Sequence, residues 1–80
     1  MTWKDFVCLD WHFMSHIALA DKHQTVRVAG ANGHSFAVCS HCPTEEYKEL
    51  HPYAHQYEHY KVDGVVYKSR KKLEEALEKI

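Results

Sequence analysis

The sequence has few residues that interrupt a chain: it contains only two prolines and three glycines in 80 residues. It also lacks an apolar run near the length of about 18 residues that a membrane-spanning helix needs. The first residues show neither the apolar stretch nor the small-residue cleavage site of a secretory signal peptide. We therefore expect one small domain without a membrane partner, and the short chain excludes a multidomain enzyme.

Cysteine is scarce, and neither sign of charge is in clear excess. The three cysteines include one tight pair, which is a poor disulfide framework and indicates a reducing compartment, cytoplasmic or nuclear. Lysine and arginine number 10 against 11 acidic residues, for a net charge of -1. Because a dedicated DNA-binding domain usually has a basic excess, this balance favours a protein partner and leaves nucleic acid as the alternative.

Histidine, by contrast, is abundant, with eight copies spread along the chain. A β-hairpin is expected before the cysteine pair, because residues 25–29 and 35–38 alternate in polarity on either side of a turn at 30–33. A short strand is expected within residues 62–67. These strands, together with the helices below, predict a small α+β domain.

Helices are expected in three places. Thr2 is a suitable cap for a helix over residues 3–13, and residues 14–20 fit helix and strand equally. Thr44 begins a second helix that runs toward Tyr60, with a break near His51 because Pro52 cannot continue a helix. A C-terminal amphipathic helix is expected over residues 69–80.

One spacing of residues is typical of a metal-binding site: Cys39-x2-Cys42-x12-His55-x3-His59. Two thiolates and two imidazoles form the tetrahedral donor set that suits Zn²⁺. Histidines four apart lie on one face of a helix, and a Cys-x-x-Cys turn directs both sulfurs inward. Zinc would then supply stability that so small a core lacks.

This spacing resembles the C2H2 zinc finger over about residues 36–59, where Phe36 matches the aromatic before the first cysteine. The resemblance implies that Cys39, Cys42, His55 and His59 are the ligands. Glu46 stands where the family has an aromatic residue and Pro52 where it has leucine. Because the hairpin lies mostly before Cys39, we expect a zinc knuckle followed by a histidine-bearing helix, with a finger-like core over residues 24–60.

Other ligand sets remain open. His51 is also four residues from His55 and could replace one of the pair. On a helix, Cys8, His12 and His16 would share one face, so Cys8 and His12 could complete the site or the three could hold a second metal. Against this stands the usual role of a free cysteine as a small buried apolar residue.

A basic cluster marks the beginning of the last expected helix. It consists of Lys68, Arg70, Lys71 and Lys72. Such a cluster can contact nucleic-acid phosphates, or it can be a solvated helix face with partners four residues away.

These observations favour a non-catalytic binding module with a structural zinc that acts as a protein- or nucleic-acid-binding adaptor or regulator. One alternative is a thiol redox protein that uses Cys39 and Cys42. Another is a metal-dependent hydrolase with Glu45, Glu46 or Glu58 as base, although the chain has no His-Glu-x-x-His motif. We therefore expect no enzyme activity.

Overall fold

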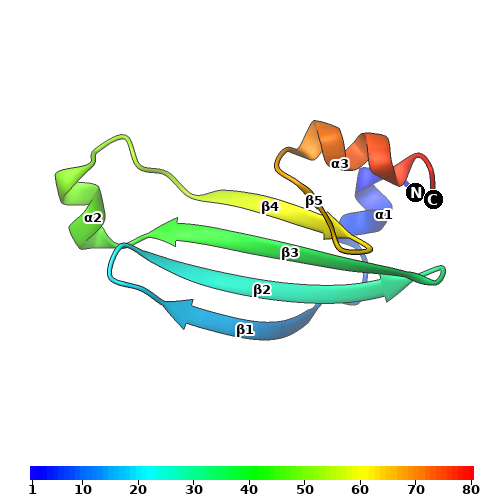
Figure 1. Ribbon diagram of the computed structural model, residues 1–80, viewed down its shortest axis with the longest axis horizontal. Helices are drawn as coiled ribbons and strands as arrows, with labels where there is room; N and C mark the ends of the chain where they lie inside the picture. Colours follow the sequence, from blue (N-terminus) through cyan, green and yellow to red (C-terminus); the bar gives the residue numbers. More distant parts are fainter.

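The computed structural model describes all 80 residues, Met1–Ile80. Its three helices and five strands form a small α+β domain, as the sequence predicts (Figure 1). They follow one another as α1 (Trp3–Val7), β1 (His12–Ala18), β2 (Lys22–Ala31), β3 (His34–Pro43), α2 (Glu45–Leu50), β4 (Tyr57–Val62), β5 (Val65–Tyr67) and α3 (Arg70–Leu77).

The strands form one antiparallel sheet in which each strand pairs with its neighbour along the chain, in the order β1-β2-β3-β4-β5. β3 lies in the middle, and β1 and β5 are the two edges. Figure 1 shows the strands along the length of the molecule, with α2 at one end and α1 and α3 at the other. The two ends of the sheet therefore differ in how they are covered.

Tight turns connect β2 to β3 and β4 to β5. Asn32 and Gly33 have φ values of 53° and 79°, and Asp63 and Gly64 have values of 50° and 85°. Positive φ at both central residues is typical of the type I′ turn, whose twist matches that of the flanking strands. The hairpin predicted over residues 25–38 is confirmed, and its strands extend further on both sides.

Each helix begins at a hydroxyl cap. Thr2, Thr44 and Ser69 accept a hydrogen bond from the backbone N–H three residues later, which satisfies a donor that the first helical turn leaves free. The predicted starts of α2 and α3 are confirmed, and α3 ends at Leu77. None of the three helices combines the length and the apolar character needed to cross a membrane.

Two predicted helices are wrong in extent. The first ends at Val7, and β1 covers His12–Ala18, so residues 12 and 13 are strand rather than helix, as are residues 14–18 of the ambiguous stretch. The second ends at Leu50, and residues 57–62 are the strand β4 rather than a helix that carries histidines. The physical reason is alternation: Tyr60 and Val62, two residues apart, are both buried on one face of the sheet, as the period of two of a strand requires.

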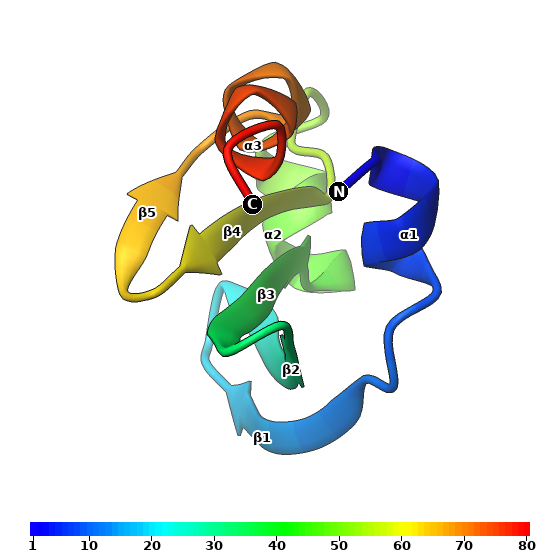
Figure 2. The same cartoon turned by 90° about the vertical axis from the view of Figure 1, so that its right-hand side faces the viewer.

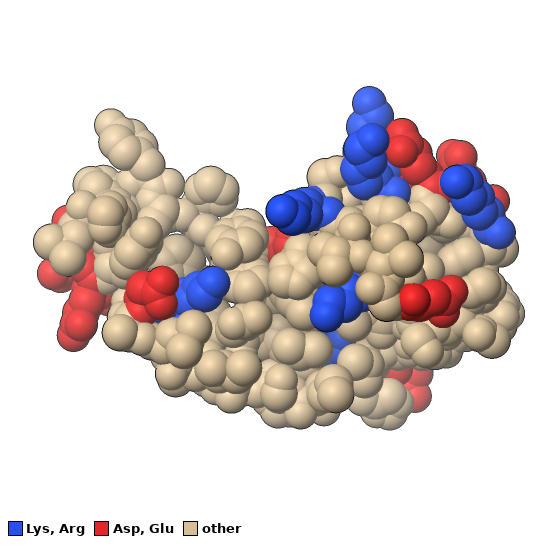
Figure 3. Space-filling model, viewed as in Figure 1, with Lys and Arg blue, Asp and Glu red and all other residues tan.

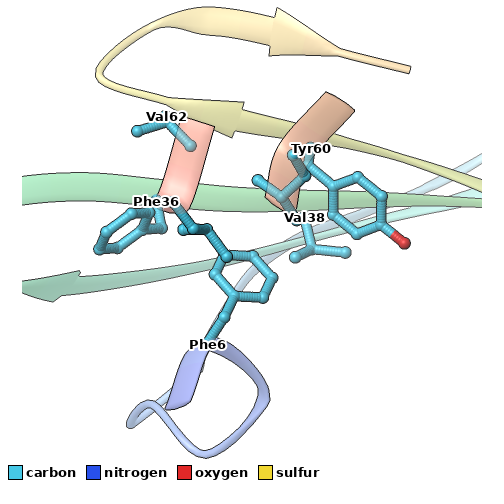
Figure 4. Packing of buried hydrophobic residues seen from close by; sticks show 7 residues of the cluster. Phe6, Phe36, Val38, Tyr60 and Val62 are labelled. Carbon is cyan, nitrogen blue, oxygen red and sulfur yellow. The ribbon is translucent and has the colours of Figure 1, made fainter. Parts of the chain in front are cut away.

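The core lies on one side of the sheet, under α1 and α3 (Figure 2). In Figure 4 the ring of Phe6 points from α1 toward the side chains of the sheet, and its centroid lies 5.8 Å from that of Phe36 in an edge-on arrangement. The buried cluster consists of Phe6, Phe36, Val38, Tyr60, Val62, Leu73 and Leu77. It joins both ends of the chain to β3 and β4.

Because side chains alternate along a strand, the core defines two faces. We call the side of the sheet that carries Phe36, Val38, Tyr60 and Val62 the helix face. We call the other side the open face. α1 and α3 pack on the helix face only, which leaves the open face without their cover. The pairing register places on the open face Lys22, Gln24, Val26, Val28, Ala37, Cys39, His41, Tyr57, His59, Lys61 and Val66.

Candidate functional site

The four residues predicted to bind zinc do not gather in one place. Cys39 and Cys42 both lie on β3, three residues apart, so their side chains point to opposite faces of the sheet. His59 lies on β4 opposite Cys39, whereas His55 is exposed in the segment before β4, with Nδ1 3.3 Å from the carbonyl oxygen of Tyr53. The structure therefore does not confirm the expected zinc knuckle.

No group of three or more His, Cys, Asp or Glu side chains is placed to hold a metal ion anywhere in the chain. The donor groups consequently do not fit a tetrahedral zinc site in this fold. Zinc remains a prediction from the sequence spacing alone.

The alternative ligands are also dispersed. His51 is the C-terminal cap residue of α2, where its ring lies 4.4 Å from that of Tyr47. Cys8 is exposed at the end of α1. His12 and His16 belong to β1, and their pairing with β2 places them on opposite faces. Cys8, His12 and His16 therefore do not lie together on one side of a helix, in contrast to the expectation from the sequence.

The two enzymatic alternatives meet similar obstacles. Residues three apart on a strand are separated by about 10 Å, beyond the Cα separation that a disulfide accepts, so Cys39 and Cys42 cannot form one without a change in the backbone. Both are free thiols. Glu45 and Glu46 are exposed in the first turn of α2, and Glu58 lies on β4. None of the three belongs to a group of side chains that could hold a metal ion.

The basic cluster is divided in the structure. Lys68 lies between β5 and α3, and Lys71 and Lys72 are exposed on the first turn of α3. The Arg70 guanidinium instead lies 4.3 Å from the ring centroid of Trp3, and its Nε lies 3.6 Å from a carboxylate oxygen of Glu74. Arg70 thus contacts Trp3 and Glu74, while its side chain stays 58% exposed.

A site that the sequence analysis did not identify lies on the open face, around His41. This residue is only 5% exposed. Its Nε2 lies 3.1 Å from Nδ1 of His59, and its ring is stacked on that of Tyr57, with 4.5 Å between centroids and 9° between planes. β3 and β4 position these side chains, since Tyr57 is directly opposite His41 in the pairing.

The surroundings of both imidazoles favour the neutral form. Burial is the main cause that lowers the pKa of His41 below its usual value, and the charge of Lys22 adds to it. The pKa of His59 is lowered by burial and then by the charges of Lys61 and Lys68. Each ring therefore has one N–H and one lone pair.

The proton of each ring can be assigned from its partners. Nδ1 of His41 is enclosed and has no hydrogen-bond partner. An enclosed N–H without an acceptor is rarer than an acceptor without a donor, so we assign the proton of His41 to Nε2, which donates to Nδ1 of His59. His59 then carries its own proton on Nε2.

The pair borders a hollow of about 350 Å³. Figure 3 shows the surface indented between the α2 end and the α3 end, with a basic side chain projecting over the indentation from the side of α3. The residues that line the hollow are His41, Tyr57, Glu58, His59, Val66 and Lys68. It offers an aromatic ring, N–H donors and a lysine.

The charged strand residues on the open face are all positive. They include Lys22 and Lys61 and no acid. Glu58 belongs to the helix face, where its charge adds to burial in raising the pKa of Tyr60. The hollow is lined by one lysine and one glutamate, and the open-face strand residues around it carry only positive charge, which favours an anionic group over a cation.

A simple sequence signal could have revealed this site. The alternation of Phe36 and Val38 continues past the predicted strand, which places Ala37, Cys39 and His41 on the other face. Comparisons with protein-family models, with curated proteins and with solved structures give no match for this chain. Function is therefore inferred from these residues.

Proposed function

We propose that the protein is a small binding module that holds single-stranded nucleic acid on the open face, at the hollow beside Tyr57. The observation that carries the proposal is an aromatic ring fixed next to lysines on an uncovered sheet. This keeps the class of function predicted from the sequence, a binding adaptor, and selects the nucleic-acid partner.

Tyr57 provides a platform for a base. Its ring stacks on His41 at 4.5 Å, which fixes its orientation, and the side chain is still 49% exposed. An exposed aromatic on a sheet accepts an unstacked base of any identity, and such stacking contributes about 1–3 kcal/mol per base. A double helix keeps its bases stacked inside, so a single strand suits this ring better.

Lysines provide the contacts for phosphate. Lys68 lines the hollow, and Lys22 and Lys61 lie on the same face of the sheet. Their charges are close enough to lower the pKa of His59. Positive charge beside a stacking ring is the combination that single-strand-binding surfaces use, and the N–H of His59 adds a donor for a phosphate or a base edge.

The test is fluorescence anisotropy with a labelled single strand of about 12 nucleotides, as RNA and as DNA, at about 50 and 200 mM salt. We expect saturable binding that weakens as salt increases. Tyr57→Ala should weaken it about tenfold through loss of one stacked base, which is about 1.4 kcal/mol. Lys68→Glu should weaken it and reduce its salt dependence.

Matched controls separate the hollow from general charge and aromatic content. Tyr53 is 95% exposed and lies outside the hollow, so Tyr53→Ala should leave binding unchanged. Lys79→Glu changes the net charge equally on the last turn of the chain, away from the open face, and should have a smaller effect than Lys68→Glu. Absence of binding by the wild type, or equal losses in the control variants, would contradict the proposal.

A further inference from the structure

β1 is a long edge strand whose outer side has no partner. It pairs with β2 on one side and forms the edge of the sheet on the other. The opposite edge, β5, has only three residues before the chain turns into α3. The unpaired backbone N–H and C=O groups of β1 can therefore pair with one more strand.

β1 also lies outside the core. No residue of His12–Ala18 belongs to the buried cluster or to the partly buried side chains around it. Phe13 and Met14 are each 67% exposed, and Ile17 and Leu19 are exposed as well. In an 80-residue chain with so small a core, this is apolar surface that a partner would remove from water.

The usual protections of an edge strand are mostly missing here. The sequence of β1 contains no lysine, arginine, aspartate, glutamate or proline, the residues that commonly prevent edge pairing. A bulge between Phe13 and Ser15 interrupts the pairing with β2, and it leaves residues 15–18 as a regular stretch of strand.

We propose that two copies of the chain pair through β1, antiparallel across a two-fold axis, into one continuous sheet of both molecules. A second copy fits because β1 has no lysine, arginine, aspartate or glutamate, so an identical strand brings no like charge from these residues next to it; His12 and His16 are its only titratable side chains. One such contact covers the apolar side chains of both molecules, as two-fold interfaces do. It leaves the hollow beside Tyr57 free, since that hollow lies over β4 and β5.

Sedimentation velocity of the full chain across micromolar concentrations is the first experiment. We expect a reversible monomer–dimer equilibrium in the wild type. Ile17→Lys and Phe13→Lys should each shift the protein toward monomer, because a charge at the edge opposes pairing. Leu50→Lys is the matched control: Leu50 is 79% exposed on α2, away from β1, and this variant should remain dimeric.

Amide hydrogen exchange of the wild type gives an independent readout that needs no variant. Exchange of the outward-facing amides of β1 should slow as protein concentration increases, while β5 should not respond. A wild type that is monomeric at every concentration, a dimer that survives both lysine variants, or concentration-dependent protection confined to other strands would each overturn the proposal. Lys68→Glu should leave the dimer intact, which separates this result from nucleic-acid binding.

Discussion

The Nε2 atom of His41 lies 3.1 Å from Nδ1 of His59, so a hydrogen bond joins two imidazole rings across β3 and β4. The arrangement needs one ring to donate and the other to accept. Protonation of either ring replaces its lone pair with an N–H in an enclosed and already positive environment. We therefore expect the pair to make the stability of the fold depend on pH.

We expect the free energy of unfolding to decrease between about pH 7.5 and 5.5. In the unfolded chain both histidines titrate near 6.5, and in the folded chain burial lowers the pKa of both. The unfolded state then binds more protons, so stability that is present above pH 6.5 is lost as the pH falls through the folded values. Urea unfolding at the two pH values measures this change.

Two variants assign the effect to the pair. His59→Gln removes one of the two groups, so its stability should depend less on pH than that of the wild type. His55→Gln alters an exposed histidine between α2 and β4 and should keep the wild-type dependence. Identical pH dependence in the wild type and His59→Gln would refute this explanation.

Among the variants considered, we expect a substitution in the core to lower the free energy of unfolding the most. Leu73 is fully buried on α3 against side chains of β3 and β4. Leu73→Ala should lower the free energy of unfolding by about 2–5 kcal/mol, because it leaves a cavity at the centre of the cluster. Leu50→Ala, at an exposed position, should change it by less than about 0.5 kcal/mol in the same urea titration.

The turn between β4 and β5 requires a glycine. Gly64 has a φ of 85°, a region that is costly for a residue with a Cβ, so Gly64→Ala should cost about 1–2 kcal/mol in thermal or urea unfolding. Gly30 is the matched control. A Cβ there would meet its nearest atom, the carbonyl oxygen of His34, at 3.5 Å, an ordinary contact, and equal losses in the two variants would argue against backbone strain.

Metal removal tests the zinc prediction directly. Because the core forms from apolar side chains and the predicted ligands lie apart, we expect the melting temperature to be the same with and without a chelator. A large decrease on chelation, together with one zinc per chain by native mass spectrometry, would show instead that Cys39, Cys42 and His59 rearrange around a metal.

Local sequence signals predicted the parts of the fold that local forces determine. The hairpin around Asn32 and Gly33 follows from alternation and a turn that accepts positive φ. The starts of α2 and α3 follow from Thr44 and Ser69, whose hydroxyls satisfy free N–H groups. These features need no information from distant residues.

The errors arose where a distant contact decides the structure. Residues 55 and 59 fit a helical spacing, but Tyr60 and Val62 are buried against α1 and α3, and this burial selects a strand. The predicted zinc site depended on that helix. The alternation along β3 could have placed His41 on the open face, but its partner His59 comes into reach only when β4 pairs with β3.

The order of strands along the chain also sets an order of events during synthesis. Each strand can pair with its predecessor as soon as it is made, whereas Phe6 near the beginning must wait for Leu73 and Leu77. Until then the nascent sheet exposes Phe36, Val38 and the other apolar residues of its helix face, which is the state in which unfinished chains aggregate. The core of this domain is therefore complete only after α3 has been synthesised.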